Sequence, residues 1–225
     1  MQLRVLLLLI ALGGEALANP VVGKIELPPP PPRPPIAVKG FLDRVDNPYK
    51  RVRDVDVGSY MVVVLDGEAK EGVVPKQLSW DLVGESFARP VAIVSVGAEV
   101  VIKNVSKTAR TLVALEDPKL IPSGPINPTG PKSFRPTEPK LYTITDKDAP
   151  HLKGKLVVVA SPFVGNVDVV NNVGKFEIDA PEGSYKVRVF YRDNWLDHAE
   201  ATVNVPAKGK AEVTVKIPAG YPLKK

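Results

Sequence analysis

Two patterns recur along the chain: segments in which apolar and polar residues alternate at period two, and segments of four or five consecutive apolar residues. Alternation is clearest at residues 185–192 and 210–217, and continuous apolar runs lie at 61–65, 91–94 and 156–160. Both patterns predict β-strands, and Pro, Gly or Asn follows most of them within a few positions. Because no stretch of ten residues carries a helical period, the sequence predicts an all-β fold of sandwiches or open barrels.

The first eighteen residues have the layout of a secretory signal peptide. A short basic start ending at Arg4 precedes an apolar run from Val5 to Leu12, and Ala16-Leu17-Ala18 has the small-x-small pattern that a signal peptidase recognises. The apolar run is much shorter than the roughly 20 residues that span a bilayer. We therefore expect residues 1–18 to be removed, and a protein that is periplasmic or extracellular and does not span the membrane.

Residues 19–38 are predicted to form a Pro-rich tether. Residues 28–35 contain seven prolines in eight positions. Proline fixes φ and cannot donate a backbone hydrogen bond, so such a run favours a semi-rigid polyproline II spacer. A docking peptide for an aromatic groove is the alternative.

Composition excludes much catalytic and metal chemistry. The 225 residues include no Cys and only two His, so disulfides, thiolate nucleophiles and Cys-ligated metals are excluded. No Gly-x-Ser-x-Gly, P-loop or Gly-x-Gly-x-x-Gly motif occurs. We therefore expect a protein that is not an enzyme and that holds no metal or cofactor.

Positive charge collects in the middle of the chain. The net charge is +5, and residues 101–160 hold ten basic and five acidic residues. A Pro-rich loop from Pro118 to Pro139 lies there, and long loops of this kind are often functional. The predicted binding surface on this segment consists of Lys132, Arg135, Lys140 and Arg110. We expect an acidic partner, an envelope protein or a polysaccharide, and no nucleic acid, because stacking aromatics are scarce.

Two segments resemble known families. The pattern Val94-x-x-Gly97-x-x-Val100, preceded by Pro90-Val91 and a strand at 62–65, resembles cupredoxin-like proteins of bacterial envelopes annotated for methylamine utilisation. Residues 174–191, with Gly-x-Phe and Pro-x-Gly-x-Tyr, resemble the carboxypeptidase regulatory-like domain. The resemblance implies a cupredoxin-like Greek-key β-sandwich at 39–168, followed by a small transthyretin- or Ig-like β-sandwich at 169–225.

The resemblance to cupredoxins also implies positions for the copper ligands, and this chain lacks the ligands there. The first His position falls on Arg110, and the Cys, second His and Met positions fall on Val158, Ser161 and Val164. A blue-copper site needs a thiolate and imidazoles. We therefore expect a non-enzymatic structural or interaction module of the envelope. The alternatives are a carbohydrate- or polyanion-binding module and, least favoured, a copper electron-transfer protein.

Overall fold

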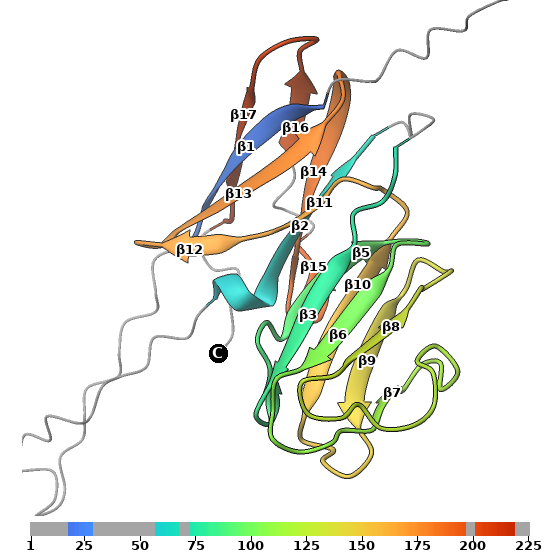
Figure 1. Cartoon of the computed structure of the whole chain (residues 1–225). Helices are drawn as coiled ribbons and strands as arrows, with labels where there is room; N and C mark the ends of the chain where they lie inside the picture. Colours follow the sequence, from blue (N-terminus) through green and yellow to red (C-terminus); the bar gives the residue numbers. More distant parts are fainter. Residues whose placement is uncertain (1–17, 29–56, 68–72, 197–200, 219–225) are drawn as a thin grey trace, which may run out of the picture.

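The computed structural model describes residues 18–28, 57–67, 73–196 and 201–218, which form four β-sheets in two sandwiches (Figure 1). Sheet A has the strand order β12-β13-β1-β17, and sheet B has the order β11-β2-β14-β15 with β16 also paired to β14. Sheet C has the order β4-β3-β6-β8, and sheet D has the order β5-β10-β9-β7. Among the described residues there is no α-helix, and the predicted all-β fold is confirmed.

Sheets A and B form the A/B sandwich. Its elements are β1 (Asn19–Glu26), the 3-10 turn η2 (Gly58–Tyr60), β2 (Met61–Asp66), β11 (Val164–Asn166), β12 (Asp168–Val170), β13 (Val173–Ala180), β14 (Gly183–Tyr191), β15 (Asn194–Trp195), β16 (Ala201–Val205) and β17 (Ala211–Lys216). Side chains alternate between the two faces of these strands, as the sequence predicts. In β13, β14 and β17 the inward side chains are mostly buried, and most outward ones face solvent.

Sheets C and D form the C/D sandwich. Its strands are β3 (Leu78–Val83), β4 (Ser86–Phe87), β5 (Val91–Ser95), β6 (Val100–Asn104), β7 (Leu112–Ala114), β8 (Pro131–Phe134), β9 (Leu141–Asp146) and β10 (Lys153–Val159). Each sheet contains one parallel pair, β3 with β6 and β5 with β10. The stacked rings of Trp80 and Phe87 lie in its core, with centroids 4.0 Å apart.

The expected tether and domain order are wrong in three respects. Residues 19–26 form β1, which pairs with β13 on one side and β17 on the other. Strand β2, expected in the cupredoxin-like unit, pairs with β14. The chain leaves the A/B sandwich after β2, builds the whole C/D sandwich and returns at β11, so the second unit is not confined to 169–225. The other tether residues, 29–38, and residues 1–17 of the signal peptide lie outside the described residues.

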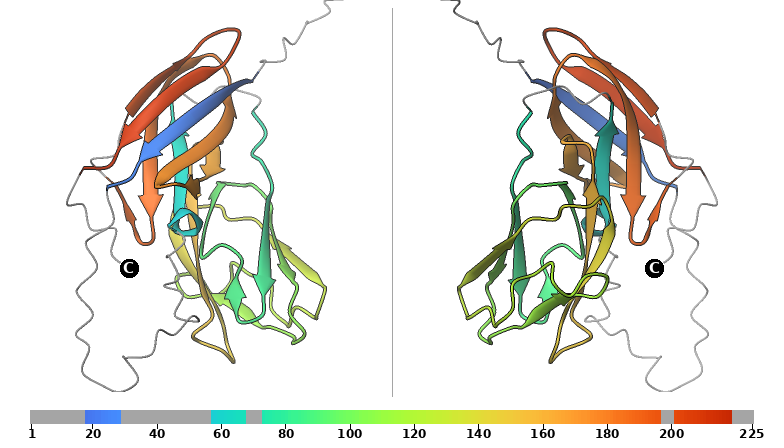
Figure 2. Two further views of the ribbon diagram at one scale, coloured as in Figure 1. Left: turned by 90° about the vertical axis from the view of Figure 1, so that its left-hand side faces the viewer. Right: turned by 90° about the vertical axis from the view of Figure 1, so that its right-hand side faces the viewer.

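An apolar interface joins the two sandwiches and explains the continuous apolar runs. Val62 and Val64 of β2 pack with Ile93 of β5 and Val157 of β10, whereas their neighbours in each strand face the two sandwich cores. Strands buried on both faces need no polar alternation. The sheets therefore stack in the order A, B, D, C, with β2 and β10 in the middle (Figure 2, left).

Polar contacts supplement this interface. Arg89, which follows β4, donates to the carbonyl oxygens of Gly58 (2.9 Å) and Val167 (2.7 Å) in the A/B sandwich. The buried Ser161 hydroxyl donates to the carbonyl of Leu65 (2.6 Å), and Ser95 donates to the carbonyl of Ser161 (2.8 Å). These bonds tie both ends of β5, from Arg89 before it to Ser95 at its last position, to the A/B sandwich or to the segment that returns to it.

Candidate functional site

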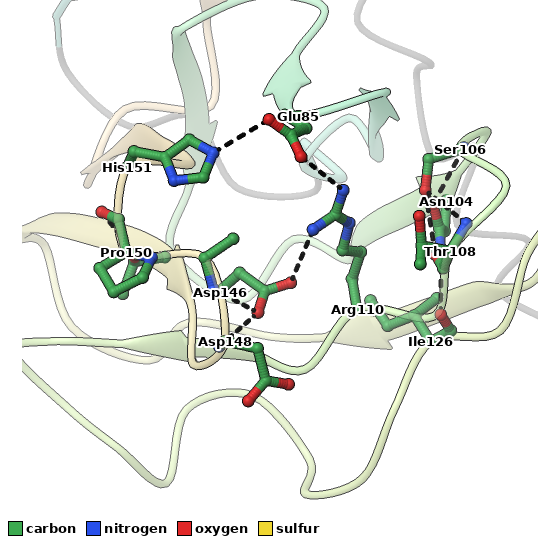
Figure 3. Close-up of polar contacts among 12 residues, drawn as sticks. Glu85, Asn104, Ser106, Thr108, Arg110, Ile126, Asp146, Asp148, Pro150 and His151 are labelled. Atoms are coloured by element: carbon green, nitrogen blue, oxygen red, sulfur yellow. Dashed lines mark hydrogen bonds and ion pairs between the residues drawn. The ribbon is translucent and has the colours of Figure 1, made fainter.

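Three segments meet at one end of the C/D sandwich, the end where β3, β6 and β9 finish (Figure 3). The β3–β4 turn contributes Glu85, the segment after β6 contributes Arg110, and the β9–β10 turn contributes His151. The turn at Gly84 adopts φ +62°, a left-handed conformation that favours glycine. Strand pairing sets the arrangement, because Leu112 of β7 faces Asp146 of β9.

Asn104 fixes the segment that carries Arg110. Its buried side-chain amide donates to the carbonyl oxygens of Thr108 (2.8 Å) and Ile126 (2.9 Å), and its carbonyl oxygen accepts from the Ser106 backbone (3.0 Å). Arg110 and Ile126 form a β-bridge with two backbone bonds of 3.1 and 2.7 Å. The backbone of Arg110 is therefore held independently of its side chain.

The guanidinium of Arg110 lies just below the surface, with its side chain 11% exposed. Nη2 donates to the carbonyl of Gly84 at 3.2 Å. Nη1 lies 3.9 Å from Oδ2 of Asp146, and Nη2 lies 3.9 Å from Oε1 of Glu85. Nε is buried and has no hydrogen-bond partner among the described residues. One cation is thus balanced by two carboxylates, neither at hydrogen-bond distance.

The two carboxylates around Arg110 differ in environment. The Asp146 side chain is 1% exposed, and its Oδ1 accepts from the backbone of Asp148 (2.8 Å) and Ala149 (3.3 Å). Glu85 is 68% exposed, and its Oε2 lies 3.2 Å from Nε2 of His151, which is 63% exposed. Removing Arg110 would leave the buried Asp146 charge uncompensated, which is strongly destabilising.

Two exposed valines lie beside this cluster. Among the described residues five large apolar side chains are strongly exposed, and Val83 (50%) and Val105 (57%) are two of them. The backbone N–H of Val105 donates to the carbonyl oxygen of Leu82 at 2.8 Å. Leu82 is paired with Asn104, and the side chains of both point inward. Since side chains alternate along a strand, Val83 and Val105 project together from the outer face of sheet C. We call Val83, Glu85, Val105 and His151, with Arg110 beneath them, the end face.

The structure does not bring the four expected copper-ligand positions together. Val158 is buried in the C/D core, Ser161 follows the far end of β10, and Val164 begins β11 in the A/B sandwich. Arg110 lies at the opposite end of sheet D, beside Asp146. A guanidinium between two carboxylates is not a copper donor set, and the chain has no thiolate, so these residues do not fit a blue-copper ion. Among the described residues, no group of three or more His, Cys, Asp or Glu could hold a metal ion.

The predicted basic surface is dispersed. The ammonium group of Lys132 donates to the carbonyl oxygens of Pro122, Ser123 and Gly124, so it braces the Pro-rich loop. Arg135 lies 4.0 Å from Glu99, and the Lys140 ammonium lies 5.7 Å from the Tyr142 ring centroid. Arg135 and Lys140 flank the far ends of β8 and β9, and β9 spans about 20 Å at 3.3 Å per residue. Arg110 alone of the four belongs to the end face.

Nothing in the sequence places Glu85, Asp146 and His151 in one site. They are separated from Arg110 by 25, 36 and 41 positions, and no motif spacing links them. Only the pairing of β3 with β6 and of β7 with β9 brings them together. The only local pattern at any of these positions is Asp146-Lys147-Asp148, two carboxylates two positions apart.

No protein-family model matches the chain, and no curated protein matches its sequence. Among solved structures, a reduced amicyanin variant is 17% identical with a TM-score of 0.34, covering 43% of this chain and 98% of its own. An oxidized amicyanin variant is 19% identical with the same TM-score and coverage. A purple cupredoxin from Nitrosopumilus maritimus is 14% identical with a TM-score of 0.34, covering 37% of this chain and 100% of its own. These neighbours are cupredoxins and match part of the chain; the carboxypeptidase regulatory-like resemblance stays a prediction.

Proposed function

We propose that this chain is a non-enzymatic interaction module of the bacterial envelope that contacts a protein partner through the end face. The observation that carries the proposal is the pair of exposed, neighbouring valines, Val83 and Val105, beside a cluster of charged side chains. Adjacent apolar side chains with a polar surround are typical of protein contact surfaces.

The rigidity of the surrounding structure supports this role. The end face is built on strand ends and on a segment held by the buried Asn104. Its charged groups contact one another, because Arg110 lies between Asp146 and Glu85. Such a face presents a fixed shape to a partner and binds without a large ordering cost.

Export is part of the same proposal. The predicted signal peptide ends at Ala18, and β1 begins at Asn19. The Asn19 side chain donates to the carbonyl of Pro206 at 3.0 Å, so the first residue after the expected cleavage site belongs to the A/B sandwich. Within the described residues, no helix has the length and apolar character needed to cross a membrane.

The test is capture from envelope extract with matched variants. We expect a Val83→Ser/Val105→Ser protein to fold normally and to lose partners that the wild type retains. Val170→Ser is the control, because Val170 is equally exposed (55%) but lies on β12 of the A/B sandwich. If the double variant and the control retain the same proteins as the wild type, the end face is not the contact surface.

A further inference from the structure

We propose that the carboxylate of Glu85 can be displaced from Arg110, and that the end face binds an acidic polypeptide segment whose carboxylate then contacts Arg110 in place of Glu85. The inference rests on the proposed function, because it names the chemistry of the partner of the same face. The two carboxylates beside Arg110 are held in unequal ways, Asp146 by backbone N–H groups and Glu85 by an exposed side chain.

Arg110 has unused capacity to bind a carboxylate. A guanidinium offers five N–H donors and pairs with a carboxylate through two parallel bonds of about 2.7–2.9 Å. Among the described residues, the Arg110 side chain donates one hydrogen bond, to the neutral carbonyl of Gly84, and both of its carboxylate contacts measure 3.9 Å. A partner carboxylate that reached bidentate geometry would gain bonds that neither resident carboxylate makes.

Glu85 is the carboxylate that can leave. Asp146 is fixed because it is buried and two backbone N–H groups hold its other oxygen. Glu85 instead lies on a two-residue turn and is two-thirds exposed, and exposed ion pairs contribute little to stability. Its second oxygen already contacts His151 at 3.2 Å, so leaving Arg110 costs Glu85 only one of its two contacts.

The charge around the end face favours an acidic partner. Four exposed lysines lie within two residues of Val105, Asp146 or His151 in the sequence; they are Lys103, Lys107, Lys147 and Lys153. Three carboxylates lie among them, the exposed Glu85 and Asp148 and the half-buried Asp81, which pairs with Lys103 across β3 and β6, whereas Arg110 and Asp146 offset each other. Four lysines against three carboxylates leave one excess positive charge. The excess of positive charge attracts an acidic segment and repels a basic one.

Binding of a fluorescein-labelled hexaglutamate peptide, followed by anisotropy, tests the proposal. Glu85→Gln removes the competing charge at an exposed position where folding is not at risk. Glu138→Gln is the matched control, because it makes the same change of net charge at an exposed residue before β9, away from the end face. We expect Glu85→Gln to tighten binding about two- to fivefold relative to Glu138→Gln, as the loss of one exposed ion pair implies.

Arg110→Lys provides the second arm, since lysine keeps the positive charge beside Asp146 but cannot form a bidentate pair. We expect it to abolish the difference between Glu85→Gln and the control, with circular dichroism unchanged. Equal affinities of Glu85→Gln and Glu138→Gln, an undiminished difference in the Arg110→Lys background, or no peptide binding would each overturn the exchange. If the valine variant still loses its partners in any of those cases, the proposed function stands and only the exchange is wrong.

Discussion

Replacing Phe190 by Ala should destabilise both sandwiches, although Phe190 belongs to only one of them. The ring projects from β14 into the interface between sheets B and D, where it is buried against Val62, Val157 and their neighbours. It also contacts Trp195 edge to face, with centroids 5.3 Å apart. A Phe→Ala change at a buried position costs about 3–5 kcal/mol, a large fraction of the roughly 5–15 kcal/mol that stabilise a typical protein.

The two tryptophans make the assay specific. In a Trp195→Phe background Trp80 is the only tryptophan, and it is buried in the C/D core. Urea unfolding followed by Trp80 fluorescence then reports on the sandwich that does not contain Phe190. We expect Phe190→Ala to lower the midpoint of that transition clearly, and Val170→Ala, an exposed change on β12, to leave it in place. If Phe190→Ala leaves the urea midpoint reported by Trp80 unchanged, the shared interface is refuted and the two sandwiches are independent units.

Three further outcomes follow from particular side-chain contacts. Ser161→Ala removes the hydroxyl that bonds Leu65 and should cost about 1–3 kcal/mol in urea unfolding, because a buried carbonyl loses its donor. Gly154→Ala would place Cβ 2.6 Å from the Trp80 ring, so we expect a loss of about 1–3 kcal/mol and a changed Trp80 emission; unchanged melting would contradict the packing. Burial raises the pKa of the Glu116 carboxyl, but hydrogen bonds from the Thr143 backbone and side chain outweigh it and hold that pKa below 4.5. The carboxylate therefore stabilises the fold above pH 4.5, and this contribution disappears as the pH falls through the lowered pKa; Glu116→Gln should flatten that acid limb of the unfolding free energy against pH.

Local patterns were enough to predict the strands but not how they assemble. Alternation at residues 185–191 defined β14 and its buried face, because period two belongs to a single strand. The same signal was present in β1, where Val21 and Ile25 point inward, but the neighbouring signal peptide and prolines favoured a tether. Nothing in residues 61–65 says that β2 pairs with β14, since an apolar run on two buried faces fits several partners.

The site was less predictable than the fold for the same reason. Arg110 was singled out by a resemblance, but the residues beside it come from turns that only long-range pairing brings near. The copper alignment placed the other three positions in the chain after the start of β10, whereas the carboxylates that meet Arg110 are Asp146, the last residue of β9, and Glu85, in the β3–β4 turn. Similarly, the basic side chains at 132, 135 and 140 are close in sequence but contact different groups. Lys132 contacts loop carbonyls, Arg135 contacts Glu99, and Lys140 contacts the Tyr142 ring.

The most direct measurement is an amide chemical-shift map of the isotope-labelled protein titrated with hexaglutamate. We expect the perturbed amides to fall at residues 83–85, 105–110 and 147–153, the three segments that build the end face, and added salt to reverse the shifts. Perturbations centred on Lys132, Arg135 and Lys140, or spread evenly over the lysines of both sandwiches, would contradict it.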